Sequence, residues 1–217
     1  MQSIRAVVFD PVGCLAEFPA EPFDRLAATL FSAGDDEVRS GSVAYWRFLG
    51  LLEQSGAPLT GSDKQLAEDL EGQAVDGVEV YPDAEPALAD LKAMGVDLLI
   101  ASSLSEAAVT RFLNRFALRG FFSSVWTRDS ASGVALAPLA RAIQNVSCAP
   151  AEVMVLADTK EGIELARAAG TNSILMINDY DQGRRLAMQS PTGGIVSLRE
   201  LADAIQLVFE VAKAGRS

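Results

Sequence analysis

Histidine is absent from this 217-residue sequence, and cysteine occurs only twice, as Cys14 and Cys148. The missing imidazole excludes Ser-His-Asp and Cys-His catalysis and any zinc site that needs histidine ligands. Two cysteines cannot form a disulfide framework, and they suit a reducing compartment. No apolar run approaches the roughly 20 residues that cross a bilayer, and no signal-like segment precedes the first strand. We therefore expect a cytoplasmic protein with no membrane partner.

Positive charge is also scarce. Lysine and arginine total 18 against 29 acidic residues, which gives a net charge of -11. A surface this acidic repels nucleic acid and anionic lipid, and no basic run overrides it, so we expect no nucleic-acid partner. The only lysines are Lys64, Lys92, Lys160 and Lys213, which leaves a long stretch between residues 92 and 160 without one.

Apolar residues are plentiful, at 49% of the chain, and they fall into two successive patterns. After an apolar strand at residues 4–9, residues 20–77 show helical periodicity throughout. From residue 78 onwards, short apolar runs alternate with amphipathic segments, which is typical of a parallel sheet covered by helices on both faces. We expect strands at 78–81, 96–101, 124–126, 152–157, 173–177 and 194–196, and helices at 85–94, 105–116, 138–146, 161–169 and 198–212.

Three polar residues come directly after predicted strands. Asp10, Ser102 and Asp158 each follow an apolar run, and ligands of such sheets bind at the carboxyl ends of the strands. If their strands are neighbours, Asp10 and Asp158 can share one magnesium ion, which prefers oxygen ligands. The Ser102 hydroxyl, before a helix N-terminus, suits a phosphate. Ser105 could instead simply cap the helix after Ser102, and Asp158 or Thr159 the helix that follows them. The shared position of these residues at one end of the sheet favours a site.

The segments around these residues resemble the haloacid dehalogenase (HAD) superfamily. "VVFDPVGCL" is similar to its first motif, "LLIASS" to its second and "VMVLADTKEGIELARAAG" to its fourth, while "VEVYPDAEPALADLKAMGV" is similar to the return from a helical cap. The resemblance implies an α/β, Rossmann-like core formed by residues 1–15 and 78–217. It also implies a small all-helical cap domain formed by residues 16–77, inserted after the first strand.

The same resemblance implies a magnesium-dependent phosphatase that acts through an aspartyl-phosphate. Asp10 matches the nucleophile. Ser102 matches the phosphate-binding hydroxyl, and we expect Ser103 and Gly13 to join it in binding phosphate or substrate. The implied metal ligands are Asp10, the backbone carbonyl of Val12, and Asp158, with Glu161 as a further candidate. The implied ligand is a small phosphorylated or carboxylated metabolite.

Two groups that phosphatases of this family use are missing. Val12 stands at the general-acid position, where it carries no proton, and Val134 stands at the position of the third-motif lysine. In the fourth motif, Gly162 replaces the second acid. General acid catalysis contributes about 10²–10⁴-fold, and a positioned cation is worth a comparable factor, so we expect impaired or absent hydrolysis. Lys160 and Arg128 are candidate substitutes for the lysine, although both are more typical of ordinary surface cations.

Three alternatives stay open. A non-catalytic member would bind a phosphate, a metabolite or a protein partner. A metal-free 2-haloacid dehalogenase would also lack the acid at Val12, but it needs the third-motif lysine and a cap arginine, for which Arg39 and Arg47 are candidates only by location. A phosphonate-cleaving relative would need a cap lysine, and Lys64 is the only one.

The cap aromatics in "YWRF", residues 45–48, also have two interpretations. Tyr45 or Arg47 could face the substrate, or the aromatic side chains could pack the helical bundle. We favour packing, because the apolar positions recur at helical spacing.

Overall fold

The computed structural model describes residues 4–34 and 40–214, with side chains to residue 208. A six-stranded sheet lies at its centre, in the order β5-β4-β1-β6-β7-β8, and every neighbouring pair is parallel. Its strands are β1 (Ala6–Phe9), β4 (Asp97–Ala101), β5 (Ser124–Trp126), β6 (Val153–Ala157), β7 (Asn172–Met176) and β8 (Gly193–Ile195). The predicted α/β class with a parallel sheet is confirmed.

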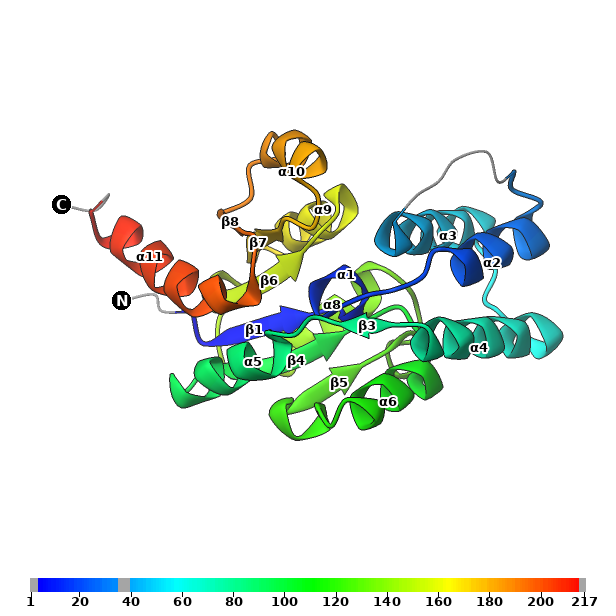
Figure 1. The fold of residues 1–217 in the computed structure, drawn as a ribbon, viewed down its shortest axis with the longest axis horizontal. Coiled ribbons are helices and arrows are strands. Elements are labelled where there is room, and N and C mark those ends of the chain that lie inside the picture. Colours follow the sequence, from blue (N-terminus) through cyan, green and yellow to red (C-terminus); the bar gives the residue numbers. More distant parts are fainter. Residues whose placement is uncertain (1–3, 35–39, 215–217) are drawn as a thin grey trace.

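Helices cover both faces of this sheet (Figure 1). They are α5 (Ala84–Ala93), α6 (Glu106–Arg115), α8 (Leu136–Gln144), α9 (Lys160–Ala168) and α11 (Leu201–Ala214). Successive side chains of a strand point to opposite faces, so β1 contributes to both layers. Val7 and Phe9 join the larger apolar cluster, whereas Ala6 and Val8 join a smaller one together with Leu139 of α8.

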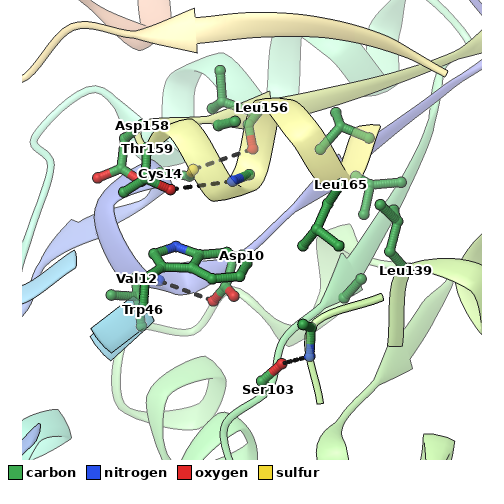
Figure 2. Close-up of a pocket in the computed structure, with 16 residues that line it drawn as sticks. Asp10, Val12, Cys14, Trp46, Ser103, Leu139, Leu156, Asp158, Thr159 and Leu165 are labelled. Carbon is green, nitrogen blue, oxygen red and sulfur yellow. Dashed lines mark hydrogen bonds between the residues drawn. The ribbon is translucent and has the colours of Figure 1, made fainter. Parts of the chain in front are cut away.

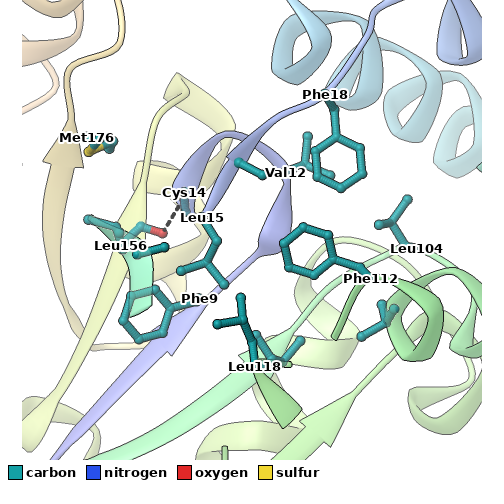
Figure 3. Packing of buried hydrophobic residues seen from close by; sticks show 14 of the residues in the cluster. Phe9, Val12, Cys14, Leu15, Phe18, Leu104, Phe112, Leu118, Leu156 and Met176 are labelled. Carbon is teal, nitrogen blue, oxygen red and sulfur yellow. Dashed lines mark hydrogen bonds between the residues drawn. The ribbon is translucent and has the colours of Figure 1, made fainter. Parts of the chain in front are cut away.

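The larger cluster continues from the sheet to the first turn after β1. Phe9 and Leu15 lie together in it, and Phe112 of α6 packs on Phe18 with ring centroids 5.7 Å apart (Figure 3). The thiol of Cys14 donates a hydrogen bond to the carbonyl of Leu156, 3.3 Å away. Burying a large apolar side chain stabilises the fold by about 1.5–3 kcal/mol, so this cluster fixes the chain on both sides of Asp10.

Three helices follow β1 and the turn after it in the sequence, before the chain re-enters the sheet region. They are α2 (Glu21–Phe31), α3 (Gly41–Ser55) and α4 (Gly61–Asp76), which we call the cap helices. The two-residue strands β2 (Ala16–Glu17) and β3 (Glu79–Val80) pair antiparallel where the chain leaves and re-enters the sheet region. Figure 1 shows the cap helices beyond the carboxyl ends of the central strands. Their division into a separate domain at residues 16–77 stays a prediction.

Polar caps begin several helices where the sequence suggested them. Ser105 accepts a hydrogen bond from the Ala108 N–H at the start of α6, and Thr159 accepts one from the Gly162 N–H at the start of α9. The residues from Ser62 to Gln65 also read as a helix start with a capping box, and this prediction is wrong. Thr60 already has the extended backbone of an N-cap residue, so Ser62 lies inside the first turn of α4.

Three short helices were not predicted. They are α1 (Pro11–Cys14), α7 (Arg128–Ala131) and α10 (Tyr180–Ala187). The first two have only four residues each, too few to show a helical repeat of apolar residues. The sequence of α10 is strongly polar, so it also lacks such a repeat. The first strand also begins at Ala6 rather than at residue 4. Among the helices in the described ranges, 4–34 and 40–214, none is both long enough and apolar enough to span a bilayer.

Candidate active site

The three strand-end residues predicted from the sequence meet at one edge of the sheet. β1 is flanked by β4 and β6, so Asp10, Ser102 and Asp158 follow three adjacent parallel strands. Asp10 and Asp158 line the same cavity of about 40 Å³. Figure 2 shows both acids around it, with Trp46 of α3 beside them. The strands that precede Asp10 and Asp158 are therefore neighbours, as a shared site requires.

The Asp10 carboxylate accepts hydrogen bonds from three neutral donors. The Ser102 hydroxyl lies 2.8 Å from Asp10 Oδ1, the Val12 N–H lies 3.2 Å from the same oxygen, and the Tyr45 hydroxyl lies 3.1 Å from Oδ2. Burial raises the pKa of the Asp10 carboxyl to about 7, although these hydrogen bonds act in the opposite direction. Because all three donors are neutral, no cation compensates the negative charge of the ionised carboxylate, which agrees with the raised pKa.

Asp158 lies on the other side of the loop that follows β1. Its carboxylate is held by the hydroxyl of Ser42 and by the amide of Asn178, whose Nδ2 is 3.4 Å from Oδ2. Burial again raises the pKa of this carboxyl to about 7. The same Asn178 amide donates to the Gly13 carbonyl at 2.9 Å. Asn178 thus ties the acid after β6 to the turn after β1.

Gly13 permits the close approach of that turn to Asp158. Its φ is +74°, in the left-handed region, and a Cβ at this position would lie 1.9 Å from Asp158 Oδ2 and 2.2 Å from the Ser42 hydroxyl. Glycine is the residue that adopts this conformation without a steric penalty. Gly13 is buried against Asp158, so its observed role is to let the two strand ends come together.

The loop after β4 supplies hydroxyl groups and backbone donors. Ser102 and Ser103 are both buried. The Ser103 hydroxyl accepts a hydrogen bond from the Ala135 N–H at 2.7 Å, which brings the loop that contains Val134 against the site. Val134 is only partly buried and lines a different groove, beside Arg128. The predicted third-motif segment therefore does border the site, with a valine where a lysine was expected.

The two cations that could replace the third-motif lysine, Lys160 and Arg128, form ion pairs with other residues. Lys160 is half exposed, and its ammonium pairs with Glu164 one turn along α9, at 3.4 Å. Arg128 is not a surface cation as expected: its side chain is 8% exposed, and its guanidinium forms a buried ion pair with Glu71, at 2.6 Å. Of the hydrogen bonds and ion pairs within residues 4–34 and 40–208, none joins a lysine or arginine side chain to Asp10 or Asp158.

The metal ligands predicted from the sequence are brought together only in part. Asp10, Val12 and Asp158 line one cavity, whereas Glu161 is exposed on the first turn of α9 and lines a different groove. Within the described part of the chain, no cluster of three or more acidic or cysteine side chains could hold a metal ion. The carboxylates of Asp158, which is buried, and of Asp10, which is partly buried, are nevertheless oxygen donors of the kind that magnesium takes, as is a backbone carbonyl. Magnesium usually keeps several waters as its other ligands. The donor set therefore fits a magnesium ion with two protein carboxylates.

Two charged residues of the cap that could have faced a substrate form ion pairs with acids other than Asp10. Arg47 pairs with Asp24 at 3.3 Å and donates to the carbonyl of Gly34, and Lys64 pairs with Asp129 at 3.2 Å. Arg39 lies outside the described residues. Trp46 is partly buried and lines the Asp10 cavity. These contacts leave the dehalogenase and phosphonate alternatives without a positioned cap cation among the residues that the structure describes.

Tyr45 lies in the candidate site, which the favoured interpretation of the cap aromatics missed. It is fully buried, and its hydroxyl touches Asp10, lies 3.4 Å from the Ser102 hydroxyl and accepts a hydrogen bond from the Ser103 N–H at 2.8 Å. Helical periodicity places it on a buried face but does not say what it meets there. Asn178 could have been found, because it follows the apolar strand β7 as the other site residues follow theirs.

Glu71 and Arg128 were also missed as a structural pair. Glu71 Oε2 accepts a hydrogen bond from the Ser105 N–H at 2.9 Å, and Arg128 donates to the carbonyl of Ser103 at 3.2 Å. The pair thus fastens cap helix α4 to the loop that carries Ser102 and Ser103. No local sequence pattern predicts this ion pair, because its two residues lie 57 positions apart in the sequence.

Comparisons with known proteins agree with this architecture. Residues 51–176, more than half of the chain, match the family model of haloacid dehalogenase-like hydrolases. Phosphoglycolate phosphatase 1 of Pseudomonas aeruginosa is 23% identical over 95% of this chain and 82% of its own.

Solved structures show the same fold. A haloacid dehalogenase-like hydrolase of Streptococcus pneumoniae superposes with a TM-score of 0.68 at 16% identity, over 93% of this chain and 98% of its own. A HAD-hydrolase of Bacillus subtilis bound to magnesium superposes with a TM-score of 0.63 at 15% identity, over 94% of this chain and 99% of its own. The chain belongs to the haloacid dehalogenase-like hydrolase family.

Proposed function

We propose that this chain is a phosphatase-type member of its family in which phosphomonoester hydrolysis is slow or lost. One observation carries the proposal: the hydrogen-bond donors on Asp10 are the N–H of Val12 and the hydroxyls of Ser102 and Tyr45, all of them neutral. A transferring phosphoryl group spreads negative charge over its oxygens, and positioned cations lower that barrier.

The residues present can still begin the reaction. Asp10 is the nucleophile, and the Ser102 hydroxyl and the Ser103 N–H are the donors that would receive phosphoryl oxygens at the start of α6. Asp10, Asp158 and the Val12 carbonyl would hold magnesium, which would neutralise charge on the phosphate. Val12 has no proton to give, so the leaving oxygen must take its proton from water.

The proposed substrate class is a small phosphorylated carboxylic acid. The relative from Pseudomonas aeruginosa is named for phosphoglycolate, which is such a compound. The Asp10 cavity of about 40 Å³ leaves little space around the nucleophile and suits a small group.

A substrate screen compares the intact chain with Asp10→Asn. Phosphomonoesters that include phosphoglycolate are assayed for phosphate release in magnesium buffer, and Asp97→Asn serves as a control because Asp97 is exposed at the opposite end of β4. We expect low rates that vanish in Asp10→Asn and persist in the control. Rates typical of enzymes, with kcat/KM of about 10⁴ M⁻¹s⁻¹ or more, would overturn the proposal. Residual rates that survive Asp10→Asn would remove Asp10 from it.

A further inference from the structure

Oxygen atoms of the cap helices occupy the backbone donors of the loop after β4. The N–H of Ser103 donates to the Tyr45 hydroxyl at 2.8 Å, and the N–H of Ser105 donates to Glu71 Oε2 at 2.9 Å. The N–H between them, that of Leu104, donates to the Ser102 hydroxyl at 3.3 Å. Three successive amides that could receive an anion before the helix are therefore already used.

The Tyr45 hydroxyl is placed as a ligand oxygen would be. It lies 3.1 Å from Asp10 Oδ2 and 3.4 Å from the Ser102 hydroxyl, and it accepts the Ser103 N–H. A phosphoryl oxygen bound next to Asp10 would need the Ser103 N–H, which the phenol now occupies, and would lie in the same space beside the Ser102 hydroxyl. Because two oxygens cannot share that position, the phenol and a phosphoryl group compete for it.

The ring of Tyr45 is held firmly in place. It is fully buried, with its centroid 5.3 Å from that of Phe23 and 5.8 Å from that of Trp46. Such aromatic contacts add to the stabilisation that burial supplies. The hydroxyl leaves the site only if α3 shifts or the ring changes its rotamer. The Glu71–Arg128 pair resists movement of α4, which packs on α2 as α3 does.

The hydroxyl is not placed to replace the missing general acid. It donates its proton toward Asp10, the attacking group. In phosphoryl transfer the attacking and leaving oxygens lie roughly in line on opposite sides of phosphorus. A donor that contacts the nucleophile and the Ser103 N–H therefore lies on the wrong side for the leaving oxygen.

We propose that Tyr45 is a specificity-determining residue whose hydroxyl holds the place of a phosphoryl oxygen and so disfavours tetrahedral oxyanions in this site. This inference rests on the proposed function, because it takes the Asp10 pocket as the ligand site. Removing the hydroxyl while keeping the ring frees the Ser103 N–H for an anion and opens the space beside the Ser102 hydroxyl.

Tyr45→Phe tests this with tungstate, a tetrahedral anion of phosphoryl shape. Binding is measured by calorimetry in magnesium buffer for the intact chain, for Tyr45→Phe and for Tyr180→Phe, a matched control whose side chain is 73% exposed. We expect tungstate to bind Tyr45→Phe at least about tenfold more tightly, because it no longer displaces two hydrogen bonds. The control should match the intact chain.

Equal tungstate affinity in Tyr45→Phe and the intact chain, including no binding in either, would overturn the inference. If Tyr45→Phe does not fold, a crystal structure of the intact chain grown with tungstate decides. Tungstate at Ser102 and Ser103 with the Tyr45 hydroxyl displaced, or a site still filled by that hydroxyl, supports the inference. Tungstate bound there beside an unmoved Tyr45 hydroxyl refutes it. Phosphate release and its loss in Asp10→Asn report separately on the proposed function.

Discussion

The buried pair between Glu71 and Arg128 gives a stability effect large enough to measure clearly. The two side chains form a forked contact, with Nη1 of Arg128 2.6 Å from Oε1 of Glu71 and Nη2 3.3 Å from Oε2. Both are almost fully buried, with 8% and 1% of their side chains exposed. Glu71→Gln keeps the shape and an acceptor for the Ser105 N–H, but it leaves the guanidinium without its counter-charge.

The cost of this change follows from the burial of the pair. Removing one partner of a buried ion pair costs about 3–5 kcal/mol, because the remaining charge is neither solvated nor paired. For a chain of this length, 1 kcal/mol corresponds to about 2–4 °C in Tm, so the midpoint should fall by roughly 6–20 °C. Lys160→Ala is the matched control. It breaks an exposed pair with Glu164, so it should cost at most about 1 kcal/mol.

Urea unfolding followed by circular dichroism measures both variants. Adding Arg128→Met to Glu71→Gln should recover part of the loss, because the double variant no longer buries an unpaired charge. If Glu71→Gln unfolds within about 1 kcal/mol of the intact chain, the pair does not hold α4 to the sheet as the contacts indicate. Equal losses for Glu71→Gln and Lys160→Ala would refute the reasoning in the same way.

Three further changes test other parts of the site. A left-handed backbone costs a residue other than glycine about 1–2 kcal/mol. Gly13→Ala should lower the free energy of unfolding by more than this, because its Cβ would also clash with Asp158 Oδ2. An unchanged urea midpoint would contradict this prediction. Asp158→Asn should remove magnesium binding measured by calorimetry, and retained affinity would place the ion elsewhere. Thr159→Ala should cost about 1 kcal/mol in urea unfolding through loss of the α9 cap, without changing magnesium affinity; a change in that affinity would make Thr159 part of the metal site.

The sequence predicted the sheet edge well because its signals there are local. A parallel strand reads as an apolar run, and the residue after it must lie at the carboxyl edge. Asp10, Ser102 and Asp158 could be placed together on that basis alone. The absence of a lysine between residues 92 and 160 can likewise be read directly from the sequence. In the structure, no lysine or arginine of the described residues is positioned at the candidate site.

The contacts between the cap helices and the sheet could not be predicted in the same way. Periodicity identifies the buried face of α3, but the partner of Tyr45 depends on how that helix packs on a loop 57 residues away. Glu71 and Arg128 look like ordinary charged residues of a helix and a loop until packing removes both from water. Arg128 was expected on the surface for that reason.

Restoring the missing groups tests the central claim most directly. Val12→Asp and Val134→Lys, combined in one chain, would supply an acid two residues after Asp10 and a cation in the loop whose Ala135 N–H contacts Ser103. The measurement is kcat/KM for the best phosphomonoester of the screen, in magnesium, for the double variant and the intact chain. We predict an increase of at least about 10²-fold, the lower limit for a general acid alone. An unchanged kcat/KM in a folded, magnesium-binding double variant would contradict the claim that these two absences limit the reaction.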